Sequence, residues 1–301
     1  MDVERPNLRE NQERSPHSRL DQEMRRPDED FDEERALELC AEISRNLLGD
    51  FAPALVLLPV YDRQRVQTLL AYTFTLFDFA RQRGVEGERL AQINRWQFTL
   101  ESALGGQPVG QPVFVRMSRE QRRRAWPAEA LDEIATCARR RATRPRPATP
   151  ADADAEAERL ASAVAGALLG KSPPGEVNAF AGALLRLRSL QTLGPEVESR
   201  RNPLAVSEMP DEWSGDPSPQ RLFEAAQREC GRLRPRLMRA PRGLLDLPAG
   251  YRRAAVFCLL ASLRLLTQIE EGDAGLLKAP PQLGVLSRLG LLARARWFRV
   301  G

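Results

Sequence analysis

The sequence predicts an all-α protein in which one multi-helix domain, residues 34–301, follows a disordered charged tail, residues 1–33. Apolar residues recur every three or four positions through most of the chain, which is the spacing of one helix face. No segment alternates apolar and polar residues between turn signals at hairpin spacing. The chain has 301 residues, of which 42% are hydrophobic, and this is enough for one large core.

The tail is predicted to be disordered because it is too polar to fold by itself. Residues 1–35 hold twelve Asp and Glu against seven Arg, a local net charge of −5, and few large apolar side chains. Such a segment buries too little apolar surface to offset the entropy lost on ordering. Because the whole chain has a net charge of +4, the remaining residues carry +9.

Helical periodicity begins near Glu34. The apolar stripe of this first helix consists of Leu37, Cys40, Ile43 and Leu47. An apolar run then ends at Pro59, and Asp62 is placed to cap a second helix that stops at Gly84. A third amphipathic helix begins near Glu86 and is closed by Gly105 and Gly106.

Prolines and glycines divide the rest of the chain into further helices. Residues 108–117 are either a connection or the start of a helix, and residues 195–218 are expected to form a loop. Helices are expected at 127–142, 151–170, 173–194, 218–238 and 249–272, before a basic C-terminal segment. In all, the pattern predicts eight to ten helices.

The rare residue types exclude several kinds of site. Cys40, Cys137, Cys230 and Cys258 lie far apart, without metal-ligand or disulfide-framework spacing. His17 is the only histidine and lies in the tail, so a histidine zinc site or a Ser–His or Cys–His pair inside the fold is excluded. No apolar run is long enough for a membrane span, and no signal peptide is apparent, so we expect a cytoplasmic protein.

Four stretches of sequence, in this helix order, carry a resemblance to a known family. They are GDFAPALVLLPVYDRQRVQTLLAYTF (49–74), RLAQINRWQFTLESALGG (89–106), ERLASAVAGALLG (158–170) and YRRAAVFCLLASLRLLTQIEEGDAGLL (251–277). Together they resemble the squalene/phytoene synthase family, whose members join two prenyl diphosphates head to head. The resemblance covers about residues 36–298 and implies the all-α isoprenoid-synthase fold.

The resemblance also implies where acidic residues should lie. Members of the family carry Asp-x-x-x-Asp motifs on two facing helices, which hold the Mg²⁺ ions that bind the diphosphates. Carboxylates four residues apart share a helix face and therefore present oxygens to one hard cation. The first motif aligns with Phe79–Arg83, which contains no acid; Asp78 lies just outside it, and Arg81 and Arg83 carry the opposite charge.

The other acidic positions of the family are also changed. The second motif aligns with Gly194–Glu198, where Gly194 replaces the first aspartate and only Glu196 and Glu198 are acidic. A third acidic position, in the middle helix, aligns with three consecutive arginines, Arg139, Arg140 and Arg141. An ordinary Mg²⁺–diphosphate mechanism is therefore not expected.

These departures predict a squalene/phytoene synthase-like protein that has lost Mg²⁺-dependent condensation and binds an isoprenoid lipid or a protein partner, without catalytic residues, metal or cofactor. The alternative is an active, divergent prenyltransferase that joins two prenyl diphosphates in squalene, hopanoid or carotenoid biosynthesis with Mg²⁺. Its acids would then be Asp78, Glu196 and Glu198, or Glu101.

Arginines offer another way to bind a diphosphate, because guanidinium groups match phosphate oxygens. The candidates are Arg81, Arg83, Arg139, Arg140, Arg141, Arg200 and Arg201. This arrangement favours binding over catalysis, because departure of the diphosphate still needs a strongly polarising cation.

The C-terminal segment, residues 286–300, combines apolar and basic residues. Its apolar members are Leu286, Leu289, Leu292, Trp297 and Phe298, and its basic members are Arg288, Arg294, Arg296 and Arg299. This composition is typical of a segment that lies on an anionic membrane surface. A helix packed on the domain with a solvated basic edge explains it as well. Nucleic-acid binding is not predicted, because the basic stretches with interleaved aromatic residues are short.

Overall fold

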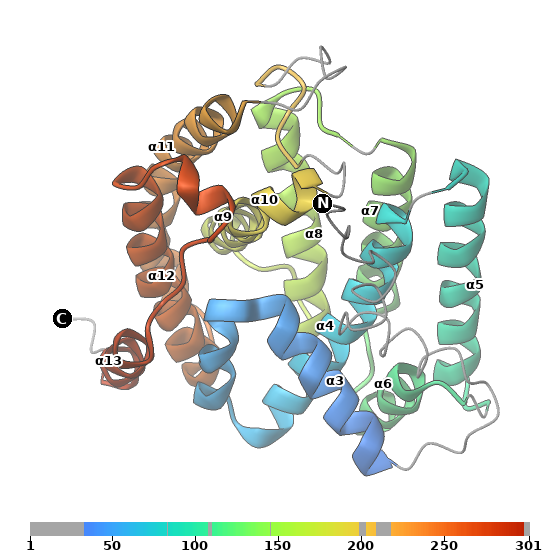
Figure 1. Ribbon diagram of the computed structural model, residues 1–301. Coiled ribbons are helices and arrows are strands. Elements are labelled where there is room, and N and C mark those ends of the chain that lie inside the picture. Colours follow the sequence, from blue (N-terminus) through green and yellow to red (C-terminus); the bar gives the residue numbers. More distant parts are fainter. Residues whose placement is uncertain are drawn as a thin grey trace, which may run out of the picture.

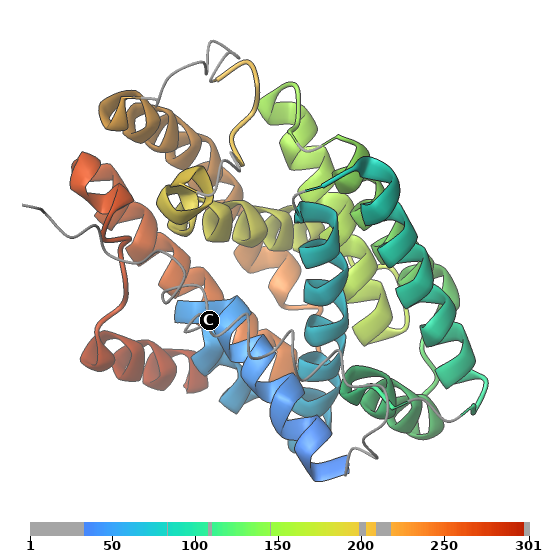
Figure 2. The same ribbon diagram turned by 45° about the vertical axis from the view of Figure 1, so that its right-hand side comes forward.

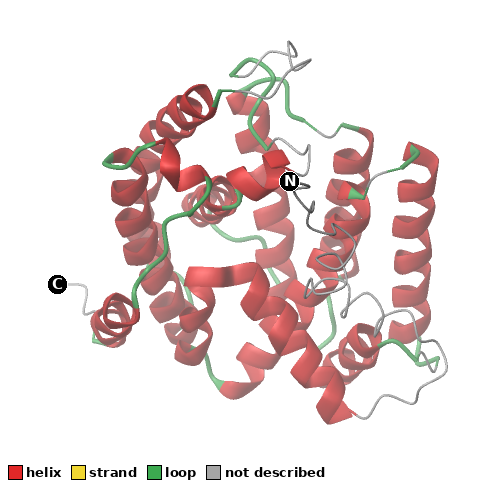
Figure 3. Ribbon diagram, viewed as in Figure 1, coloured by secondary structure: helices red, strands yellow, loops and turns green. Residues whose placement is uncertain are grey.

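The computed structural model describes residues 33–82, 84–107, 110–144, 146–198, 203–208 and 218–297. Within these ranges every regular element is a helix, eleven α-helices and two 3-10 helices, and none is a strand (Figure 3). The predicted all-α fold class is therefore confirmed. The predicted disordered tail lies outside the described residues, apart from Glu33, which begins the first helix.

The first half of the fold, shown from blue to green in Figure 1, contains six elements. They are α3 (Glu33–Leu48), η1 (Gly49–Leu57), α4 (Val60–Arg81), α5 (Glu86–Leu104), α6 (Pro112–Arg123) and α7 (Ala128–Thr143). The segment 108–117 thus contributes the start of a helix, α6. Asp62 does not cap α4, because the helix begins earlier, after the extended residue Pro59; Asp62 lies in its first turn and accepts a hydrogen bond of 3.3 Å from the Tyr251 hydroxyl.

The second half contains seven elements. They are α8 (Pro150–Leu169), α9 (Gly175–Gln191), α10 (Leu193–Glu198), α11 (Pro219–Leu244), α12 (Ala249–Glu270), η2 (Ala274–Leu277) and α13 (Val285–Arg296). The prediction of a loop from residue 195 was wrong at its start, because α10 continues the chain as a short helix after α9. Leu193 anchors this turn, since its side chain is completely buried.

Eight elements contact their neighbours in a closed ring (Figures 1 and 2). The order around the ring is α3, α4, α7, α8, α9, α11, α12, η1 and back to α3. Outside the ring, α5 packs on α4 and α7, α6 packs on α3 and α4, and α13 packs on α12 and η1. This arrangement turns one face of each ring helix towards a shared interior.

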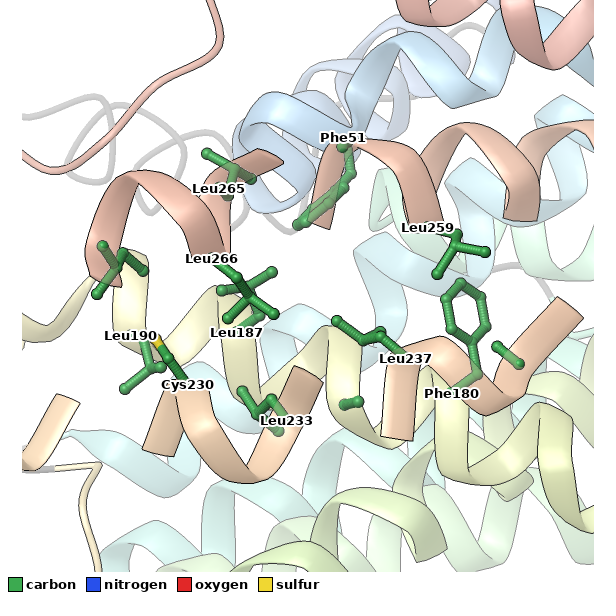
Figure 4. Close-up of a cluster of buried hydrophobic side chains, with 14 of the residues drawn as sticks. Phe51, Phe180, Leu187, Leu190, Cys230, Leu233, Leu237, Leu259, Leu265 and Leu266 are labelled. Atoms are coloured by element: carbon green, nitrogen blue, oxygen red, sulfur yellow. The ribbon is translucent and has the colours of Figure 1, made fainter. Parts of the chain in front are cut away.

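Two large apolar cores hold the ring together. In the C-terminal core, η1, α9, α11 and α12 bury Phe51, Phe180, Leu187, Leu233 and Leu266 against one another (Figure 4). In the N-terminal core, Trp96 of α5 lies at the centre of an aromatic group. Its ring centroid is 4.3 Å from that of Phe114 and 6.5 Å from that of Tyr72, and Phe79 meets it edge-on at 5.6 Å.

Candidate functional site

The half-buried residues of α4 mark the face of this helix that turns inward. Between Arg65 and Leu76, every residue of α4 is buried except Leu70 and Phe74. The same stripe continues through Phe77, Asp78 and Arg81, at the spacing of one helix face. Since neighbouring helices bury the rest of this central segment, the stripe faces the interior of the ring.

Helix α12 contributes a second inward face. Ala254, Ala255 and Cys258 are half-buried, although they lie opposite the exposed Arg253 and Arg264. Burial raises the pKa of the Cys258 thiol to about 12. The residue nevertheless retains some accessible surface.

The two inward faces meet at one end of the ring interior. Leu70 and Ala254 pack against the same small cluster of apolar residues, together with Leu168 of α8. Phe74 and Phe77 also pack against the N-terminal core, and Ala254 and Cys258 against the C-terminal core. We call Leu70, Phe74, Phe77, Ala254 and Cys258 the inner apolar surface.

A group of charged residues lies where α4, α7, α8 and α10 bring their ends together. We call Arg81, Arg141, Glu156 and Glu196 the charged rim. Arg81 Nη1 lies 3.9 Å from Glu196 Oε1. The pKa of the Arg141 guanidinium is lowered to about 10, mainly by burial and to a smaller extent by the positive charge of Arg81. The negative charges of Glu156 and Glu196 oppose this shift.

Arg141 is the rim residue whose charge is least compensated. Its side chain is half-buried, and in the part of the chain that the structure describes its guanidinium makes no hydrogen bond or ion pair. Its pKa of about 10 still keeps the group protonated at neutral pH. A buried positive charge without a partner is costly, and an anionic ligand would remove that cost.

A polar pocket opens beside the rim, between the end of α7 and the start of α8. Its volume is ≈ 430 Å³, and its lining consists of Arg140, Thr143, Arg144, Asp152, Ala155, Glu156 and Arg159. Glu156 belongs to both the pocket and the rim. Solvent therefore reaches the rim region from this side.

The structure distributes the three consecutive arginines of α7 in three directions. Arg139 turns to α5, where its Nε donates to Asn94 Oδ1 at 3.0 Å and its Nη2 donates to Gln97. Arg140 is exposed and lies 3.9 Å from Glu133. Arg141 alone of the three joins the rim.

The predicted acids are less concentrated than a metal site requires. Asp78 is half-buried on the inward stripe, and Glu196 pairs with Arg81. The side chain of Glu198 lies outside what the structure describes, although its backbone ends α10. Glu101 is exposed on α5, outside the ring.

Some of the predicted arginines cannot be placed. Arg83, Arg200 and Arg201 fall outside the described residues.

Sequence reasoning did not single out Arg186 of α9. Its Nη2 lies 2.7 Å from Glu229 Oε1, and both side chains are almost fully buried. The signal was a pair of arginines, Arg186 and Arg188, within the apolar periodicity of "LLRLRSL".

Gly194 shows why an acid is excluded from one position of the second motif. A Cβ placed on Gly194 would lie 1.7 Å from the carbonyl oxygen of Leu277, a backbone atom of η2. Real Cβ atoms essentially never lie within 3.0 Å of another atom, so any side chain here would have to displace η2. Glycine at this position is part of how α10 packs against η2.

The side chains that the structure describes do not fit Mg²⁺. Among the described residues, no group of three or more His, Cys, Asp or Glu side chains is placed to hold a metal ion. A hard divalent cation needs several oxygen ligands, whereas the rim combines its carboxylates with the guanidinium groups of Arg81 and Arg141. Within the rim, the guanidinium groups of Arg81 and Arg141 offset the negative charge of Glu156 and Glu196 that would attract a cation.

Comparisons with known proteins agree with this architecture. The fold is similar to that of a dehydrosqualene synthase crystallised with a ligand, with a TM-score of 0.67 and 14% identity over 88% of this chain and 96% of that one. It is also similar to the squalene synthase HpnC from Alicyclobacillus acidocaldarius, with a TM-score of 0.60 and 16% identity over 78% and 92% of the two chains. No protein-family model matches the sequence, and no curated protein matches it. The chain therefore has the squalene/phytoene synthase-like fold that its sequence predicts.

Proposed function

We propose that the protein binds an isoprenoid lipid with an anionic head group inside the helical ring and does not catalyse Mg²⁺-dependent condensation. The observation that carries this proposal is the charged rim, where Arg81 and Arg141 lie at the end of the inner apolar surface. The rim offers positive charge where the family resemblance implies carboxylates.

The head group is matched to the rim by charge. A phosphate or diphosphate accepts paired hydrogen bonds from guanidinium groups. It would also provide Arg141 with a negatively charged ion-pair partner. The prenyl chain is matched to the inner apolar surface, because its burial against Leu70, Phe74 and Cys258 removes apolar surface from water. Release of the diphosphate would still need a cation that the rim does not favour.

Labelling of Cys258 tests this proposal. Cys40, Cys137 and Cys230 are buried, so Cys258 is the cysteine with accessible surface, and it lies on the inner apolar surface. Because its raised pKa leaves little thiolate, Cys258 should react slowly with a small thiol reagent, and labelling is followed over hours at mildly alkaline pH. Farnesyl diphosphate should slow this reaction further, to the same extent in Mg²⁺ and in EDTA. Farnesol, which lacks the phosphates, should protect less, and Cys258→Ala provides the background rate. Equal labelling with and without either lipid would reject binding at this surface.

The fold similarity favours a second candidate, an active prenyltransferase that joins two prenyl diphosphates. It requires a Mg²⁺ site made from Asp78 and Glu196, with Glu198 or further acids. Release of diphosphate that depends on Mg²⁺ distinguishes this candidate from lipid binding alone.

A protein partner for the same fold and a cytoplasmic location remain predictions from the sequence. No helix in the described ranges is long and apolar enough to cross a membrane.

A further inference from the structure

Helix α13 turns an apolar face to solvent. Val285 is 70% exposed, Leu286 85%, Leu289 56% and Trp297 76%. The last three lie three and eight residues apart, which places them on one side of the helix. Isolated exposed apolar residues are ordinary, but a face made of four large ones is typical of an interaction surface.

The opposite face of α13 fixes the helix to the domain. Ala295 is completely buried, and Leu291 and Leu292 pack against the C-terminal core. Arg288 Nη2 lies 2.6 Å from Asp50 Oδ1, and the same oxygen accepts a 3.1 Å hydrogen bond from the Leu283 amide. Asp50 is 4% exposed, so this contact holds α13 in one orientation.

Helix α13 lies at the edge of the molecule, with α12 and η1 on its inner side (Figures 1 and 2). The exposed apolar face is therefore a fixed feature of the surface.

The chain segment that carries this face has charges of one sign. Residues 274–301 contain five basic residues, Lys278, Arg288, Arg294, Arg296 and Arg299, and no Asp or Glu. Arg294 and Arg296 are exposed beside the apolar face, whereas the charge of Arg288 is compensated by Asp50. The available positive charge and the apolar side chains therefore point to the same solvent region.

We propose that α13 docks on the surface of an anionic lipid bilayer, with its apolar face in the headgroup region and Arg294 and Arg296 at the lipid phosphates. An apolar face flanked by arginines, with a tryptophan at its end, combines the two forces that hold interfacial helices. The twelve-residue helix, about 18 Å long, would lie flat on the membrane. This inference does not depend on what the ring interior binds.

Co-sedimentation of the full-length protein with vesicles tests the proposal. Binding to vesicles of phosphatidylcholine with phosphatidylserine is expected, with little binding to phosphatidylcholine alone and weaker binding at high salt. The double variant Arg294→Gln/Arg296→Gln should bind anionic vesicles about 30-fold more weakly, since two charges near the surface are lost. The double variant Leu286→Gln/Leu289→Gln should also bind more weakly at any salt concentration.

Matched controls are available on α5, on the opposite side of the molecule in Figure 1. Phe98 is 68% exposed and Arg95 is exposed, so Phe98→Gln and Arg95→Gln remove the same kinds of group and should leave binding unchanged.

Four outcomes would overturn the proposal. Equal binding to neutral and anionic vesicles would reject the electrostatic contribution, and no binding to either would reject the membrane. A dimer in solution that Leu286→Gln/Leu289→Gln dissociates would identify a second copy as the occupant. Binding that appears only after residues 1–32 are removed would identify the acidic tail as the occupant.

Discussion

The backbone of Gly194 lies so close to Leu277 that a Cβ there would stand 1.7 Å from the Leu277 carbonyl oxygen. This contact joins α10 to η2 beside Glu196, the rim residue that pairs with Arg81. The space that an aspartate side chain would need at position 194 is thus occupied by the backbone of Leu277. Recovery of a metal site would need a movement of η2 as well as a change of side chain.

Gly194→Ala should destabilise the protein by about 1–3 kcal/mol, the range found when a packed site receives an extra group. Urea unfolding measures the free energy. Gly231→Ala is the matched control, because nothing lies within 4 Å of its Cβ position inside α11, and alanine there should add up to about 1 kcal/mol of stability. A Gly194→Ala protein as stable as the parent would show that η2 does not close this position.

Glu229→Gln should be one of the most destabilising polar substitutions. The Nε atom of Arg186 donates a hydrogen bond of 2.9 Å to Glu229 Oε1, and Arg186 Nη2 lies 2.7 Å from the same oxygen. Both residues are buried. Loss of the carboxylate leaves the Arg186 charge buried without a counter-ion, at a cost of about 3–5 kcal/mol. Glu208→Gln removes a more exposed partner of Arg232 and should cost about 1 kcal/mol or less. Equal losses in urea unfolding would contradict the ranking.

Stability should fall at alkaline pH. Burial raises the pKa of the Cys40 thiol from 9.0 to about 12, and that of Cys230 likewise to about 12. The folded state therefore retains protons that the unfolded state releases. The contribution is complete below pH 9 and is lost as pH rises towards 12, by about 1.4 kcal/mol per pH unit for each thiol.

Cys40→Ala identifies the source of this alkaline loss. The variant is expected to be less stable at pH 7, because a buried side chain is shortened, but to show a shallower decline between pH 9 and 11. Urea unfolding at several pH values gives both quantities. An unchanged slope would mean that Cys40 does not titrate on unfolding.

Arg141→Gln should separate stability from binding. It removes a partly buried charge that Arg81 repels, so the folded protein should keep or gain stability. Its affinity for farnesyl diphosphate should fall at least tenfold, about 1.4 kcal/mol, if one charge-assisted contact is lost. Arg140→Gln, one residue earlier and exposed, should change neither quantity. Calorimetric titration and thermal unfolding measure the two effects, and an Arg141→Gln protein with parental affinity would remove Arg141 from the site.

Local patterns predicted most of the helices, because each has its own apolar stripe and its own stop signal. The loop expected from residue 195 failed because α10 is held by the burial of Leu193, which is a tertiary contact. Three consecutive arginines on one helix point about 100° apart, so the sequence of α7 predicted a cluster but not that Arg141 alone would join the rim. The contact between Gly194 and Leu277 joins residues far apart in the chain and has no local signal.

The apolar character of the C-terminal segment was predictable, and its orientation was not. Leu286 and Leu292 look equivalent in the sequence, yet Leu286 is exposed and Leu292 packs against the core. The ion pair between Arg288 and Asp50 selects the face that turns outward, and it depends on η1, which lies more than two hundred residues earlier.

The most direct test of the lost metal site is an assay of diphosphate release from farnesyl and geranylgeranyl diphosphate, in Mg²⁺ and in EDTA, with thermal unfolding of the same samples. We predict no release, and a rise in melting temperature that is the same with and without Mg²⁺ and is smaller in Arg141→Gln at the same ligand concentration. Release that requires Mg²⁺ and is abolished by Asp78→Asn would contradict this account and assign the protein to the active prenyltransferases.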